Sequence, residues 1–270
     1  MDHPADLHPA PAAITHAPTV RQQLFEFVLQ LADTSLVLGH RLSEWCGHGP
    51  VLEQDLALAN IALDLLGETR SLYHYAAELE GQGRTEDDLA YLRPATAYRN
   101  PLLVEQPNGN FAHTVVRQFL FDNYHYHFLL ALKEGPDEPL AGIAGKAVKE
   151  AAYHLKWSSE WLIRLGDGTA ESRQRLDRAL ATLWRYAAEL TTPTATEAAL
   201  QDLGLVPSYA DILPTMQAHQ TRVLAEATVP VPQIAPFAQK GGKAGQHSEH
   251  LGYLLAELQY MQRAYPGLTW

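Results

Sequence analysis

Cysteine is almost absent from this chain of 270 residues, in which Cys46 is the sole example. One thiol cannot form an intrachain disulfide, so we expect a reducing, cytoplasmic location. No apolar run is long enough to span a bilayer, because charged or polar residues interrupt each one. The first 20 residues are rich in Pro, Ala and His and lack the basic start and apolar middle of a signal peptide. We therefore expect a disordered tail over residues 1–20 and a single domain over residues 21–270.

Basic residues are also scarce, since 20 Lys and Arg stand against 31 Asp and Glu, giving a formal net charge of -11. A nucleic-acid-binding protein needs clustered Lys and Arg to contact phosphates, so this balance argues against that class. Hydrophobic residues make up 46% of the chain and charged residues 19%. These proportions are typical of a globular protein and exclude a disordered one. We expect neither a nucleic acid nor a membrane among its partners.

Apolar residues recur at helical spacing over most of the chain. Four long helices are predicted, at Val20–Trp45, Leu52–Glu80, Phe111–Lys133 and Pro139–Leu165. The connection between the second and the third, residues 84–110, is long enough to cross a bundle, and this layout is that of a ferritin-like fold. Further helices are expected near Ala170–Leu190, Tyr209–Ala227 and His247–Ala264. The predicted fold class is all-α, a ferritin-like helical bundle with additional C-terminal helices.

A di-iron centre in such a bundle takes carboxylates from two helices and a Glu-x-x-His motif from each of the other two. Residues three apart share one helix face, so a carboxylate and an imidazole can reach the same metal pair. No Glu-x-x-His occurs on the second or the fourth predicted helix. Matched by register, the six ligand slots read Ser35, Leu65, Glu68, Asp122, Ala151 and His154. Two of the six match in type, so we predict that this chain holds no metal.

Three of these side chains are ionisable, namely Glu68, Asp122 and His154. Buried charges are costly unless paired, so we expect a hydrogen-bonded cluster in which His154 is protonated or donates to a carboxylate. Glu150, four residues before His154, is an alternative partner for that imidazole. Two other interpretations stay open: a metalloenzyme with an atypical site at Glu68, Asp122 and His154, or surface positions for these residues.

Several segments also resemble the C subunit of the bacterial 1,2-phenylacetyl-CoA epoxidase. They are Arg41–His48, Asp55–Ile61, Leu63–Gly67, Leu102–Phe111, Lys146–Ala151, Tyr153–Leu155, Glu249–Leu251 and Ala256–Gln259. The resemblance extends over about residues 24–270, which is nearly everything beyond the tail.

This resemblance implies a multicomponent di-iron monooxygenase of phenylacetate breakdown, which forms a ring epoxide on phenylacetyl-CoA with O₂ and electrons from NADPH. The A subunit holds the iron, and the C subunit shares the ferritin-like fold and is structural. The implied function of this chain is therefore a non-catalytic subunit without a cofactor or catalytic residues of its own. Its implied partner is the A subunit, with the small B subunit and the reductase subunit as further candidates.

Phenylacetyl-CoA is a candidate ligand at the subunit interface. Two segments are possible contacts for its CoA group: Ala97, Tyr98, Arg99 and Asn100, and then Ala198, Ala199 and Leu200. A guanidinium suits phosphate geometry, although an ordinary solvated loop residue is the alternative interpretation of Arg99. A stand-alone acyl-CoA binding protein is a further alternative.

Two other features have simpler explanations. The Gly241–Gly245 loop lacks the length and the ending of a P-loop, so we expect a flexible linker or a partner contact. His125 and His127 point to alternating sides of their helix, so we expect packing or interface contacts for them.

Overall fold

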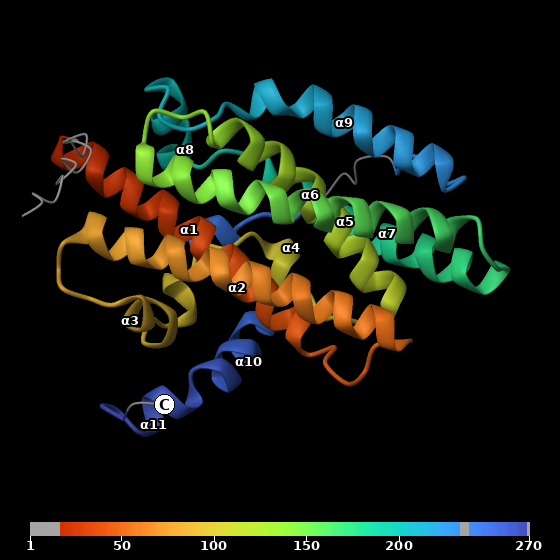
Figure 1. Ribbon diagram of the computed structural model, residues 1–270, viewed down its shortest axis with the longest axis horizontal. Helices are drawn as coiled ribbons and strands as arrows, with labels where there is room; N and C mark the ends of the chain where they lie inside the picture. The colour runs from red at the N-terminus through yellow and green to blue at the C-terminus, as the bar shows by residue number, and fades with distance from the viewer. Residues whose placement is uncertain (1–16, 233–237, 269–270) are drawn as a thin grey trace, which may run out of the picture.

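The computed structural model describes residues 17–232 and 238–268, and the regular secondary structure of this part is entirely helical. The bundle is built from four long helices: α1 (Pro18–Ser43), α2 (Leu52–Glu80), α5 (Phe111–Leu132) and α6 (Glu138–Gly166). Helix α1 packs along α2 and α5 packs along α6, and the two pairs meet where α2 lies beside α6 (Figure 1). The predicted all-α bundle is confirmed.

The bounds of the four long helices differ from the predicted ones by two residues or fewer. The predicted helices in the second half of the chain are also present, as α7 (Ala170–Leu190), α9 (Tyr209–Glu226), α10 (Glu249–Leu258) and α11 (Tyr260–Ala264). The last two were predicted as one helix, which the structure divides at Gln259. Of the predicted tail, residues 1–16 lie outside the described residues, and residues 18–20 belong to α1.

Short helices that we did not predict lie within the connecting segments. The crossover contains α3 (Glu86–Tyr91), a 3₁₀ turn η1 (Ala95–Ala97) and α4 (Leu102–Glu105), and α8 (Ala195–Asp202) follows α7. A second 3₁₀ turn, η2, spans Gly242–Ala244. The crossover is therefore an ordered part of the fold.

Buried Asp33 on α1 attaches the crossover to the bundle. Its carboxylate pairs with the guanidinium of Arg93, accepts a hydrogen bond from the Tyr73 hydroxyl at 2.6 Å, and accepts one from the Arg99 backbone N–H at 2.8 Å. A buried carboxylate with this many donors avoids the free energy penalty of an unpaired charge. The path of residues 93–99 is thus determined by α1.

Helices α1 and α5 form the centre of the molecule. Helix α5 is surrounded by α6, α7 and α9, and α1 is covered by α2 and α8. Both helices are therefore buried on nearly every face, including polar positions such as Ser35, Asp122 and His125. No helix of the described part of the chain is long and apolar enough to cross a membrane.

Candidate functional site

The six predicted ligand slots come together in the interior of the four-helix bundle. Ser35 lies on α1, Leu65 and Glu68 on α2, Asp122 on α5, and Ala151 and His154 on α6, and all six are buried. The register used to match them along the sequence thus places them on inward faces. What they form there depends on which polar atoms pair.

Glu68 is the centre of one hydrogen-bonded group. Its Oε1 lies 3.0 Å from the Ser35 hydroxyl, which donates to it, and 3.0 Å from His125 Nε2. Burial acts to raise the pKa of Glu68, but the charge and hydrogen bond of His125, together with Ser35, hold that pKa below its ordinary value. Burial acts to lower the pKa of His125, and Glu68 raises it above its ordinary value. Glu68 and His125 form a buried ion pair.

His125 is therefore a member of the site that we did not predict. The alternation of His125 with His127, two residues away, predicts packing or interface contacts for both. The informative comparison is with Asp122, three residues before it, because residues three apart share one helix face. His127, in contrast, is half-buried and has a lowered pKa caused by burial alone.

His154 belongs to a second pair, on the α6 side of the interior. Its Nε2 lies 3.0 Å from Oδ2 of Asp64 on α2, so the imidazole donates to a carboxylate. The alternative partner considered from the sequence, Glu150, makes no hydrogen bond to His154 in the described structure. The polar interior thus contains two separate carboxylate–imidazole pairs in place of one compact cluster of Glu68, Asp122 and His154.

Asp122 lies between these two pairs and has weaker partners. Its Oδ1 accepts a hydrogen bond from Gln118 at 3.3 Å. Burial raises the pKa of Asp122 to about 6, although the charge of His154 and a hydrogen bond from Ser158 act against this rise. Asp122 is consequently a carboxylate that protonates far more readily than an exposed one.

These donors do not fit a metal pair. A di-iron site needs bridging carboxylates, and the side chains in two of the slots are the hydrocarbons of Leu65 and Ala151. Oε1 of Glu68 already accepts a hydrogen bond from Ser35 and pairs with Nε2 of His125. Within residues 17–232 and 238–268, no group of three or more His, Cys, Asp or Glu side chains is arranged to hold a metal ion.

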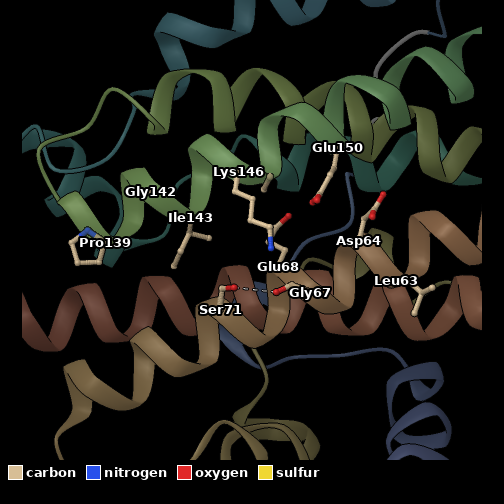
Figure 2. Close-up of a pocket in the computed structure, with 11 residues that line it drawn as sticks. Leu63, Asp64, Gly67, Glu68, Ser71, Pro139, Gly142, Ile143, Lys146 and Glu150 are labelled. Atoms are coloured by element: carbon tan, nitrogen blue, oxygen red, sulfur yellow. Dashed lines mark hydrogen bonds between the residues drawn. The ribbon is translucent and has the colours of Figure 1, made fainter.

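A trough of about 510 Å³ leads from the surface to this interior between α2 and α6. We name it the α2–α6 trough. It is lined by Leu63, Asp64, Gly67, Glu68 and Ser71 from α2, and by Pro139, Gly142, Ile143, Lys146, Ala147 and Glu150 from α6. Figure 2 shows Asp64 and Glu150 reaching into it from opposite helices, with Lys146 and Glu68 to one side of them. Burial and the nearby Asp64 raise the pKa of Glu150 above its ordinary value.

The sequence of this chain matches known proteins over most of its length. The family described as "Phenylacetic acid catabolic protein" matches residues 8–270. The chain is 48% identical over 248 residues to the C subunit of the 1,2-phenylacetyl-CoA epoxidase of Escherichia coli (strain K12). That match covers 92% of this chain and 99% of the relative.

This chain belongs to the phenylacetic acid catabolic protein family. The resemblance stated from the sequence segments is thereby confirmed, and so is the ferritin-like fold expected from it. The residues matched by the family include both the bundle and the C-terminal helices.

The two candidate CoA-contact segments of this family member lie on either side of the Gly241–Gly245 loop. Ala97 and Arg99 are half-buried, and Arg99 donates to the backbone carbonyls of Thr96 and Tyr98. Tyr98 and Asn100 are fully buried, with hydrogen bonds to Ala90 O and to Glu105. In the second segment Ala198 and Ala199 are half-buried and Leu200 is buried. Among the seven candidates, then, Ala97, Arg99, Ala198 and Ala199 retain exposed surface.

The prediction of a flexible linker at the Gly241–Gly245 loop is wrong. Lys243 is buried, and its Nζ lies 3.0 Å from Oε1 of Glu197, directly before the second segment. A Cβ on Gly242 would lie 2.3 Å from the carbonyl oxygen of Asn100, so only glycine fits against the first segment. This loop therefore connects the two candidate segments by tight packing and an ion pair.

Proposed function

We propose that this chain is a non-catalytic structural subunit of a 1,2-phenylacetyl-CoA epoxidase, which forms a ring epoxide in phenylacetate catabolism. In this role it pairs with the iron-bearing A subunit and stabilises it. The observation that carries the proposal is the pair of hydrocarbon side chains, Leu65 and Ala151, in slots where a metal pair needs carboxylates. The full-length match to a C subunit supports the assignment of the complex.

The partners follow from the same proposal. The chain binds the A subunit directly, and the small B subunit and the reductase subunit join the assembly in the cytoplasm. Phenylacetyl-CoA lies at the subunit interface, where Arg99 is the basic side chain of the two candidate segments. The iron resides in the partner, and no cofactor is held by this chain.

Reconstitution with metal analysis tests the proposal. The A subunit and this chain are co-expressed, and the purified complex is assayed for O₂- and NADPH-dependent turnover of phenylacetyl-CoA with the B and reductase subunits. We expect a stable complex, iron in proportion to the A subunit alone, and loss of turnover when this chain is omitted. Full turnover by the A subunit without this chain would refute a stabilising role.

The same preparations distinguish the two alternative functions. A metalloenzyme at Glu68, Asp122 and His154 predicts stoichiometric metal in this chain purified alone. An acyl-CoA binding protein predicts that the isolated chain binds phenylacetyl-CoA in a calorimetric titration. The structural role predicts neither result.

A further inference from the structure

One face of α2 is apolar and exposed along the outside of the bundle. Leu52, Leu56 and Leu63 are 71%, 55% and 65% exposed. Their spacing of four and seven residues places them on one side of the helix. No element of the described part of the chain covers these side chains, although neighbouring leucines of α2 are buried against α1.

The same face of α2 continues into the α2–α6 trough, which extends along the helices beyond the cavity of about 510 Å³. A second cavity of about 500 Å³ shares Ser71, Pro139 and Ile143 with it and extends to Glu78. From Leu63 to Glu78 a helix rises roughly 23 Å, at about 1.5 Å per residue. An opening of this length between two helices matches a third helix of about four turns.

Two glycines line the trough at positions where no contact within the described part of this chain requires glycine. A Cβ on Gly67 of α2 or on Gly142 of α6 would meet nothing within 4 Å. Glycine within a helix is less stable than alanine by about 1 kcal/mol. Where α1 and α2 pack closely, the chain uses Gly39, whose added Cβ would lie 3.3 Å from the carbonyl oxygen of Ala62. Gly67 and Gly142 provide the same clearance for a helix that is not part of this chain.

The charge of the trough indicates the chemistry of that helix. Asp64, Glu68 and Glu150 line the cavity of about 510 Å³, in which Lys146 is the one Lys or Arg. The second cavity adds Arg70, which pairs with Glu86, and Glu78. Asp64 and Glu68 pair with imidazoles, whereas Glu150 has no hydrogen bond or ion pair within 17–232 and 238–268. A cationic side chain entering between Glu150 and Asp64 would complement them. A second copy of this chain, with a formal net charge of -11, would instead bring further negative charge.

We propose that the α2–α6 trough and the leucine face beside it receive a helix of the iron-bearing partner subunit. That helix presents small or apolar residues to Gly67 and Gly142, and places a Lys or Arg between Asp64 and Glu150. This inference rests on the proposed function, and it names the surface through which the two subunits pair.

Filling the trough tests the inference without disturbing the fold. In Gly67→Leu and Gly142→Leu the new side chains enter open space and raise helix propensity, so the free chain should unfold at the same or a higher temperature. The control is Ala181→Leu, at an exposed position of α7 outside the trough. Binding of each variant to the purified A subunit is measured by calorimetry.

We expect about a tenfold or greater rise in Kd for the two glycine variants and none for the control. If the glycine variants bind like the wild type, the trough is not the interface, although the structural role remains. If the wild type itself does not bind the A subunit, the proposed function fails. A dimer of the chain alone that either glycine variant abolishes would assign the trough to a second copy and overturn the inference.

A charge variant tests the cation separately. Glu150→Lys should raise the Kd and weaken the dependence of binding on salt concentration, because one attractive contact is removed. Glu171→Lys, which makes the same change at an exposed position of α7, should leave both unchanged. Equal behaviour of the two variants would exclude a cation at Glu150.

Discussion

Asp122 offers the sharpest test of how the bundle interior is built. It is buried, its pKa is raised to about 6 from an ordinary 3.8, and burial is the main cause. The native state therefore binds a proton more tightly than the unfolded chain does. Such a group lowers stability as the pH rises from the unfolded-state pKa to the native-state pKa. Replacing Asp122 with Asn keeps the shape and removes the ionisation.

The size of the expected stability difference follows from the difference between the pKa of Asp122 in the native state and its pKa in the unfolded chain. At about 1.4 kcal/mol for each pH unit, the interval from 3.8 to about 6 corresponds to about 3 kcal/mol at neutral pH. At about pH 4.5 the native carboxyl is mostly protonated already, and about 1 kcal/mol of that penalty remains. The free energy of unfolding of Asp122→Asn should therefore exceed that of the wild type by up to about 3 kcal/mol near pH 7.5. This advantage should shrink by about 2 kcal/mol at the lower pH.

Urea unfolding of both proteins at the two pH values, followed by circular dichroism, measures this difference. Asn keeps the oxygen that accepts from Gln118. Its NH2 group takes the place of Oδ2, which has no hydrogen-bond partner in the described structure, so the change of the stability difference with pH is the decisive quantity. The reasoning would be refuted if Asp122→Asn were less stable than the wild type near pH 7.5. It would also be refuted if the difference in unfolding free energy were the same at both pH values.

Two further predictions concern the buried ion pairs and use the same unfolding assay. Lys243→Met should lower the free energy of unfolding by about 3 kcal/mol, because Glu197 keeps its charge without a cation. The double variant with Glu197→Gln should recover most of that loss. His125→Leu should lower the free energy of unfolding most at pH values between the lowered pKa of Glu68 and the raised pKa of His125. The stabilisation by this ion pair is lost as the pH falls through the pKa of Glu68 or rises through the pKa of His125. A loss independent of pH would show that packing alone explains it.

The long helices could be predicted because their apolar spacing is regular and glycine or proline follows each one. The short helices could have been found from another signal. Thr85 with Asp88, and Thr194 with Glu197, form capping boxes at the starts of α3 and α8. A capping box before a segment with too few apolar residues for a periodic pattern escapes a search based on periodicity. Local caps, not hydrophobic spacing, determine these elements.

The interior slots could be placed from register, since one face of a helix repeats every three to four residues. The hydrogen-bond and ion-pair partners of these residues could not be predicted from register. The pairing of His154 with Asp64 crosses from α6 to α2, and that of Lys243 with Glu197 joins residues 46 apart in the sequence. Which of two nearby carboxylates an imidazole reaches depends on the helix separation and side-chain rotamers, which periodicity does not contain.

The charge balance of the interior explains why Leu65 and Ala151 suit a bundle that folds without metal. Four carboxylates in one dry interior repel one another and require cations to offset them. In this chain, hydrocarbons fill two of the four carboxylate slots and Ser35 fills a third, so Asp122 is the one carboxylate left in them, while Glu68 stands in an imidazole slot. Glu68 is neutralised by His125, and Asp122 is protonated readily because its pKa is about 6. Restoring a carboxylate at Leu65 or Ala151 without a metal would add a buried charge with no partner. The apolar side chains thus remove an electrostatic cost, and this is the physical reason to regard them as part of a stable scaffold.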